Sequence, residues 1–275
     1  MIDDIPWPQY IAHTSTQAHT YPGIVISYDF PLNERVRTLL RLEGLYARAS
    51  WFIEQASAAD HQTALYTLFE ILEVASRADL KSDLLQELER QKRLLSALRD
   101  NPGISEAALD AVLDEIENAC SGLFAISGKV GQNLRENEWL MGIKQRACIP
   151  GGTCEFDLPS YHHWLHQDAT LRRQYLNDCL APMLPICDGL AIVLKLLRES
   201  GKRYPFTAQQ GNFQQMQGGR VVQMLRISLD SALPCVPEVS ANKYVLNIRF
   251  IAADYAAKST LYEQDVAFDL TFCSL

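Results

Sequence analysis

Apolar residues recur at helical spacing through most of the first half of the chain. A β-branched and aromatic run at residues 24–30 predicts a strand, and Pro31 ends it. The spacing of apolar residues then changes to every third or fourth position, which predicts amphipathic helices. These predicted helices cover residues 33–53, 61–76 and 81–99, and a fourth follows a strong break at residues 101–103.

The middle of the chain has shorter helical segments that are separated by turn residues. The pattern predicts helices over residues 134–147, 159–167, 169–180 and 186–199. The Ile149 to Gly152 segment, Ile-Pro-Gly-Gly, predicts a tight turn, and Pro182 and Pro185 predict a break before the last helix. That helix is unusually apolar but too short to cross a bilayer, so we expect it to be buried in the core.

Strand patterns return in the last part of the chain. Residues 220–229, 243–251 and 265–272 are rich in apolar and β-branched residues, and the last run alternates apolar with polar positions. Helices first and strands last are the order of an α+β protein. We predict a mostly helical domain at residues 24–200 and an antiparallel β-domain at residues 201–275. The early strand should join the late sheet, because a lone strand is only marginally stable.

Residues 1–23 show neither period, and we predict a mobile N-terminal arm there. This N-terminus also lacks the basic and apolar regions of a signal peptide. The seven cysteines are odd in number and lack paired spacing, which argues against a disulfide framework and favours a reducing cytoplasm.

The net charge of −8 is distributed unevenly along the chain. Residues 1–200 carry 18 Lys and Arg against 27 Asp and Glu, whereas residues 201–275 carry 7 against 6. An acidic chain of this kind is not typical of nucleic-acid-binding proteins, which are normally basic. We therefore expect no nucleic-acid partner and, because no apolar run is long enough, no membrane insertion.

A histidine cluster is the sharpest candidate for a metal site or a catalytic site. His162 and His166 are four residues apart, so both imidazoles would lie on one face of a helix and could meet one ion. The cluster lacks the Glu of a His-Glu-x-x-His motif and has no second ligand group downstream, so we expect no metal or cofactor. Cys154 with His162 is the candidate nucleophile pair. A metal- or thiol-dependent enzyme using Cys154 and the His162/His166 cluster therefore stays open as an alternative.

A second candidate motif, the segment from Ser127 to Gly131, invites comparison with a phosphate-binding loop. That loop needs a hydroxyl residue directly after its lysine to hold magnesium, and here Val130 follows Lys129. We interpret this segment as a turn.

Four basic residues lie on or beside the predicted strands of the tail: Arg220, Arg226, Lys243 and Arg249. Each alone is explained by a solvated sheet face. As a set, they could form a local cationic surface on an acidic protein. Guanidinium groups pair bidentately with carboxylates, so such a surface would suit an acidic peptide.

Several segments, in order along the chain, resemble the ZapD family of bacterial cell-division proteins. The most distinctive is residues 149–166, where Ile-Pro-Gly-Gly, a cysteine, Phe-Asp-Leu-Pro, a histidine and Trp-Leu-His follow one another as in the family. Further similar segments are residues 30–43, 80–91, 131–135, 228–230 and 248–250. The resemblance covers about residues 24–275 and leaves the N-terminal arm without a role.

The resemblance implies a protein that is not an enzyme and acts in the cytoplasm at the mid-cell division site. Members of the family bind the C-terminal peptide of FtsZ and, as homodimers, bundle FtsZ filaments during Z-ring assembly. The helical domain would then provide dimerisation and the β-domain partner binding. A dimer with two sites can link two filaments, so we expect modest affinity for each site and sensitivity to salt.

The resemblance also suggests residues that contact the peptide. It points to Arg77, His162 and Arg249, of which Arg249 matches the family's Ile-Arg-Phe motif. Lys243 and Arg226 complete the predicted partner-binding set. Some relatives carry another basic residue four positions before Arg249, where this chain has Val245.

Overall fold

The computed structural model describes residues 24–75, 79–99, 103, 105–216, 221–254, 256 and 258–275. The predicted arm at residues 1–23 lies outside the described residues, as does Arg77. The chain divides into two compact units. One combines residues 1–37 with residues 194–275, and the other is residues 38–193.

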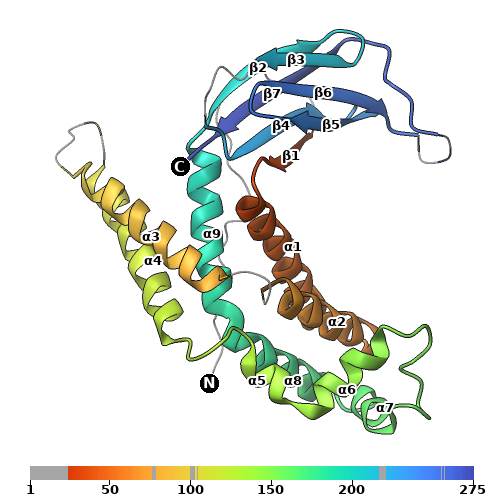
Figure 1. Ribbon diagram of the computed structural model, residues 1–275. Coiled ribbons are helices and arrows are strands. Elements are labelled where there is room, and N and C mark those ends of the chain that lie inside the picture. The colour runs from red at the N-terminus through yellow and green to blue at the C-terminus, as the bar shows by residue number, and fades with distance from the viewer. Residues whose placement is uncertain are drawn as a thin grey trace. The chain divides into compact units, whose positions relative to one another are not determined.

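The unit of residues 38–193 is helical (Figure 1). Its elements are α1 (Glu34–Glu54), α2 (Ala58–Ala75), α3 (Leu80–Ser96), α4 (Glu106–Ala125), α5 (Gln132–Glu136), α6 (Glu138–Ala147), α7 (Pro159–Leu165), α8 (Ala169–Leu180), the 3-10 turn η2 (Ala181–Met183) and α9 (Leu184–Glu199). Helix α1 begins, and helix α9 ends, in the other unit. The predicted helices are confirmed, including α9, whose apolar residues are mostly buried.

Two boundaries in the helical part differ from the sequence prediction. The helix predicted over 134–147 is two helices, because Asn137 ends α5 and begins α6, where its side-chain oxygen accepts a hydrogen bond from the Leu140 amide at 3.0 Å. The prediction that Pro182 and Pro185 break the chain is wrong. Each proline lies in the first turn of its element, where a missing N–H costs nothing, so helical structure continues through η2 into α9.

The resulting helical stretch, residues 169–199, is the one segment of the described chain that is long and apolar enough to cross a membrane. Half of its most apolar window is buried inside the protein. A core helix of a soluble protein meets the same two criteria, so this stretch is weak evidence for a membrane span.

A buried arginine on α8 ties the segment between α1 and α2 to the end of α7. Arg172 is 5% exposed, and its Nε donates to Nδ1 of the fully buried His61 at 3.0 Å. Its terminal nitrogens donate to three backbone carbonyls, those of Ala56 (2.8 Å), Leu165 (3.0 Å) and Gln167. Burial lowers the pKa of His61 below its ordinary value of 6.5, and the Arg172 charge lowers it further, so the imidazole is neutral and can accept this bond.

The other unit contains seven described strands in two antiparallel sheets (Figure 1). The strands are β1 (Val25–Pro31), β2 (Lys202–Ala208), β3 (Asn212–Met216), β4 (Met224–Asp230), β5 (Cys235–Ala241), β6 (Val245–Ala252) and β7 (Val266–Cys273). One sheet has the order β1-β4-β7-β2, and the other has the order β3-β6-β5. The α+β class is confirmed, and so is the prediction that the early strand joins the late sheet, because β1 pairs with β4.

The two sheets pack face to face over an apolar core. Leu225, Ile227 and Leu229 of β4 and Leu246, Ile248 and Phe250 of β6 belong to one buried cluster. The Phe250 ring lies 5.1 Å from the ring of Phe268 on β7, which joins the two layers. Since side chains alternate along a strand, residues between these core positions point outward from the sandwich.

Candidate partner-binding site

Arg249 lies at the centre of the outer face of the sheet β3-β6-β5. Its neighbours Ile248 and Phe250 are fully buried, which fixes the register of β6 and turns Arg249 outward, where it is exposed. Asn212 on β3 and Glu238 on β5 are its cross-strand partners. The guanidinium is therefore presented on a rigid three-stranded platform.

From Arg249 toward the Lys243 hairpin, this outer face carries uncharged polar side chains and then an apolar spot. Asn247 pairs with Gln214 on one side and Ser240 on the other. Further along, Val245 pairs with Met216, which is 74% exposed. The guanidinium on such a face can bind one carboxylate, and the amides and the hydroxyl can form hydrogen bonds along an extended peptide. The apolar spot can pack against an apolar side chain of the peptide.

Sequence reasoning missed Asn212, Gln214, Met216 and Glu238 because it predicted neither β3 nor β5. Both strands are short or polar and form the edges of their sheet, where apolar patterning is weakest. Glu238 matters most, because a carboxylate directly across from Arg249 partly offsets its charge.

Lys243 lies at the tip of the hairpin between β5 and β6. The side-chain oxygen of Asn242 accepts hydrogen bonds from the amides of Tyr244 (2.8 Å) and Val245 (2.9 Å), which holds the turn. The Lys243 ammonium lies 4.8 Å from the centre of the Tyr244 ring, and that ring is 64% exposed. Lys243 and Arg249 are six positions apart, so their Cα atoms are roughly 20 Å apart along an extended chain.

Arg226 lies on the opposite side of the sandwich. It is on β4 between the core residues Leu225 and Ile227, so it points outward from the other sheet. Its Nε and Nη2 donate to the two carboxylate oxygens of Asp29 at 2.7 and 3.0 Å. The structure therefore places Arg226 and Arg249 on different faces of the sandwich, and Arg220 lies outside the described residues.

Asp29 holds a second arginine as well. Arg198, near the end of α9, donates to Oδ2 of Asp29 at 2.9 Å. Burial would raise the pKa of the Asp29 carboxyl. The hydrogen bonds and charges of Arg226 and Arg198 outweigh burial and hold that pKa below its ordinary value of 3.8. Asp29, Arg198 and Arg226 thus form a cross-link within this unit.

Replacing Asp29 by asparagine should lower the free energy of unfolding by about 2 kcal/mol at neutral pH. This is less than for a fully buried pair, because the side chains of Arg198 and Arg226 are 23% and 27% exposed. A carboxyl with a depressed pKa stabilises the fold above its unfolded pKa, and that stability is lost as pH falls. The gap between wild type and variant should therefore close below about pH 4, in urea unfolding followed by circular dichroism. Asp178→Asn, at an exposed position, is the control, and a gap that does not change with pH would contradict the role given to Asp29.

His162 lies on α7 in the helical unit and is exposed. Its ring centre is 4.4 Å from that of His166, whose Nδ1 lies 2.9 Å from the His162 carbonyl oxygen. Within the described ranges, no group of three or more His, Cys, Asp or Glu is placed to hold a metal ion. The Cys154 thiol donates to the Gly151 carbonyl at 2.9 Å rather than to a histidine.

The predicted site residues are thus divided between the two units. Arg226, Lys243 and Arg249 belong to the strand unit, and His162 belongs to the helical unit. Arg77 is outside the described residues.

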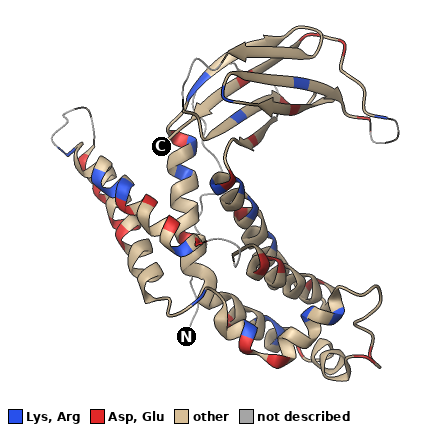
Figure 2. Ribbon diagram, in the orientation of Figure 1, with Lys and Arg blue, Asp and Glu red and all other residues tan. Residues whose placement is uncertain are grey.

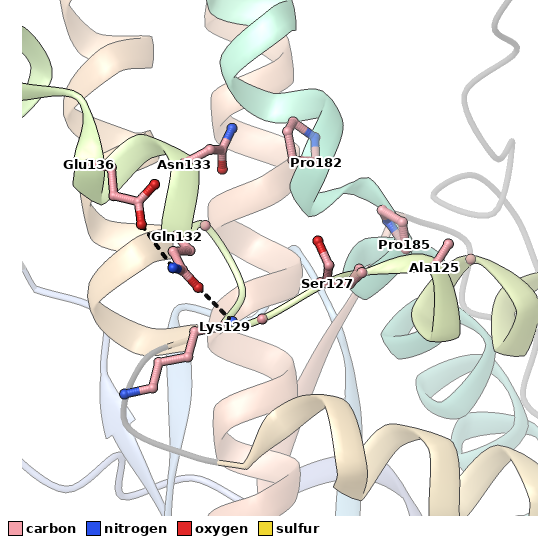
Figure 3. A pocket seen from close by; sticks show the side chains of 12 residues that line it. Ala125, Ser127, Lys129, Gln132, Asn133, Glu136, Pro182 and Pro185 are labelled. Carbon is pink, nitrogen blue, oxygen red and sulfur yellow. Dashed lines mark hydrogen bonds between the residues drawn. The ribbon is translucent and has the colours of Figure 1, made fainter.

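An open pocket of about 630 Å³ lies in the helical unit at the Ser127 to Gly131 loop (Figure 3). Gly128 and Gly131 both have positive φ, at 72° and 67°. The side chain of Gln132 accepts a hydrogen bond from the Lys129 amide at 3.3 Å and donates to Glu136 at 2.8 Å. The Lys129 amide therefore already has an acceptor within the chain, and the segment is a turn, as the sequence interpretation had it.

Comparisons with known proteins agree with one another. A family model described as "ZapD: Cell division protein" matches residues 40–249. A protein of Chromobacterium violaceum is 58% identical over 250 residues, which cover 90% of this chain and 99% of the relative. Relatives from Aromatoleum aromaticum and Azoarcus sp. are 56% and 54% identical, each over 91% of this chain and 98% and 100% of the relative. All three relatives are named "Cell division protein ZapD".

Proposed function

This chain belongs to the ZapD family of cell division proteins, and from that premise we propose that it binds the C-terminal peptide of FtsZ and bundles FtsZ filaments as a homodimer. The observation that carries the proposal is Arg249, exposed at the centre of a polar sheet face. In this proposal the protein acts in the cytoplasm at the division site and is not an enzyme.

The peptide binds in an extended form along the outer face of β3-β6-β5. Arg249 pairs with a carboxylate of the peptide through two parallel hydrogen bonds. Such bonds are strong because both partners are charged. Asn247 and Gln214 hydrogen-bond to its backbone, and an apolar peptide side chain packs on Met216. Because Val245 occupies the position of an additional basic residue in some relatives, the apolar contact replaces a second ion pair here.

Bundling follows from the number of sites. A monomer with one site can only coat a filament, whereas a twofold dimer presents two sites and can join two filaments. Many weak contacts along a polymer then act together, because each bound dimer raises the effective concentration for the next contact. The affinity of a single site for the free peptide should accordingly be modest.

The alternative of a metal- or thiol-dependent enzyme has no specific support from the geometry of the described residues. The Cys154 thiol and the His166 ring each make a hydrogen bond to a nearby carbonyl, and the relatives are named for cell division. We do not propose this alternative.

Sedimentation with polymerised FtsZ tests the proposal. The protein should pellet with filaments of intact FtsZ and stay in the supernatant with filaments that lack the C-terminal peptide. Raising the salt from about 50 to about 500 mM should reduce the pelleted fraction, because exposed ion pairs are screened. Equal pelleting with both kinds of filament would contradict the proposed binding mode.

A further inference from the structure

Exposed apolar side chains gather at the tip of the hairpin between β5 and β6. Met216 is 74% and Tyr244 is 64% exposed, and Met216 pairs across the strands with the half-buried Val245. The ammonium of Lys243 lies beside them, 4.8 Å from the centre of the Tyr244 ring. We call these four residues the tip patch. Apolar residues that cluster on a surface mark a site of contact with another segment.

Lys243 is the cation of the tip patch. Charged residues are sparse on the strands of this unit (Figure 2). The hairpin, residues 235–252, carries three of them: Glu238, Lys243 and Arg249. Glu238 and Arg249 pair with each other four positions along β6 from Val245, so neither belongs to the tip. A segment that fits the tip patch therefore carries a carboxylate with apolar residues around it.

The first 23 residues of the chain hold a segment of this kind. The matching family model covers residues 40–249, and the resemblance covers about residues 24–275, so neither assigns these residues a role. Residues 12–23 contain no Asp, Glu, Lys or Arg, and residues 1–11 contain no Lys or Arg. Two carboxylates and five large apolar side chains lie within residues 2–11: Asp3, Asp4, Ile2, Ile5, Trp7, Tyr10 and Ile11. This composition suits an acidic, apolar docking segment joined to the fold by a polar linker.

The spacing of side chains in this segment matches the tip patch. Asp3, Ile5 and Trp7 are each two positions apart, so in an extended segment they point to one side. Prolines alternate with them and favour an extended backbone. On the hairpin, Lys243 and Val245 are also two positions apart. A carboxylate at Lys243 therefore places the next side chain on that side against Val245 and its cross-strand neighbour.

The chain is long enough to bring this segment to the tip patch. Residues 8–23 number sixteen and can span roughly 50 Å when extended. They end at Ile24, whose carbonyl oxygen accepts a hydrogen bond from the Ser231 amide at 2.8 Å. From Ser231, four positions lead to the start of β5 at Cys235, and the seven residues of β5 lead to the tip. That path is roughly 40 Å long.

We propose that residues 2–7 of this chain dock on the tip patch. An aspartate carboxylate pairs with Lys243, and the apolar side chains cover Met216 and Tyr244. A tethered segment has an effective concentration of about 1 mM, far above that of a segment on another molecule in dilute solution. The occupant is therefore the N-terminal segment of the same chain.

The docked segment is an internal competitor of the FtsZ peptide. This part of the inference rests on the proposed function, in which an apolar side chain of the peptide packs on Met216. A contact of modest affinity at an effective concentration of about 1 mM fills only part of the sites. The segment thus lowers the affinity for the peptide without abolishing binding, and it leaves Arg249 accessible.

Zero-length carbodiimide coupling tests the docking itself. The reagent joins a carboxylate to an amine in contact with it, and mass spectrometry of the digested full chain locates the link. Links from Asp3 or Asp4 to Lys243 should exceed those to Lys258 at least about fivefold, and high salt should remove the excess. Lys258 is the matched control, because it is an exposed lysine of the same unit outside the tip patch. Equal yields at the two lysines would overturn the inference.

A mixture of isotopically labelled and unlabelled protein shows which copy supplies the segment. The links to Lys243 should join two residues of the same copy, because the tether keeps them together. Links that join labelled to unlabelled copies in the proportions of the mixture would overturn docking within one chain.

Combining Asp3→Asn, Asp4→Asn and Trp7→Ala in the full chain should tighten binding of the free FtsZ peptide about 2- to 5-fold, because the competitor is lost. Fluorescence anisotropy of a labelled peptide measures the change. Thr16→Ala with Gln17→Ala, in the polar linker, is the matched control and should leave the affinity unchanged. Equal affinities of the triple variant and wild type would overturn the competition.

The two experiments separate this inference from the proposed function. Selective links to Lys243 without any binding of the FtsZ peptide would support the docking and contradict the proposed function. Unselective links, together with peptide binding that the triple variant does not change, would overturn the inference and leave the proposed function standing.

Discussion

Replacing Arg172 by methionine should lower the free energy of unfolding by about 3–5 kcal/mol. Methionine keeps much of the volume of the side chain but cannot donate a hydrogen bond. The change leaves four acceptors without their donor: His61 Nδ1, the Ala56 carbonyl between α1 and α2, and the Leu165 and Gln167 carbonyls at the end of α7. Each buried acceptor left unsatisfied costs about 1–3 kcal/mol. The bond to His61 is buried and the three carbonyl bonds are partly buried, so the carbonyls contribute less than full burial would give.

Tryptophan fluorescence during urea unfolding measures this loss, because the described tryptophans, Trp51, Trp139 and Trp164, all lie in the helical unit. Arg173→Met is the matched control on the same helix. Arg173 also donates to carbonyls at the end of α1, but it is less buried, so its loss should cost about 1 kcal/mol. An equal loss in the free energy of unfolding for both variants would contradict the larger contribution assigned to the more buried Arg172.

Replacing Arg249 by glutamate should weaken binding of the free FtsZ peptide at least about 20-fold. The change removes the cation at the centre of the β3-β6-β5 face and sets a second carboxylate beside Glu238. Arg249→Lys should lose less, because lysine keeps the charge but not the two parallel hydrogen bonds. Fluorescence anisotropy of a labelled peptide at low salt measures all three affinities.

Two further variants make this test specific to the proposed face. Lys129→Glu makes the same change of charge at an exposed position in the helical unit and should leave the affinity unchanged. Glu238→Gln removes the offsetting carboxylate and should tighten binding about 2- to 5-fold. Wild-type affinity in the Arg249→Glu variant would move the site away from this face.

Local sequence patterns predicted the helices, the interior strands and the edge strand β1, but not the edge strands β2, β3 and β5. Strands β4, β6 and β7 have enough apolar residues to be recognised alone. Strands β2 and β5 contain Pro205 and Pro237, and β3 is short and rich in glutamine. Proline and polar residues are tolerated at sheet edges because one side of an edge strand has no neighbouring strand to hydrogen-bond with. The sequences of these strands therefore show little of the apolar pattern by which a strand is predicted.

The candidate site shows the same limit at longer range. In the sequence, Arg226 and Arg249 look alike, since each is a basic residue inside an apolar strand. The pairing of strands puts the two arginines on opposite faces of the sandwich. Asp29 forms an ion pair with Arg226, whereas Arg249 stays exposed. No periodicity within a strand encodes which sheet it joins, so the separation of the two arginines could not be predicted from local pattern.

The position of β1 has a consequence for biosynthesis. Its Asp29 meets Arg226 across 197 positions of sequence, and the entire helical unit lies between them. At typical ribosomal rates, β1 waits roughly 10–40 s for its partner strand to be translated, while the helical unit between them can already fold. A nascent chain stopped anywhere before β4 would leave β1 without a sheet to join.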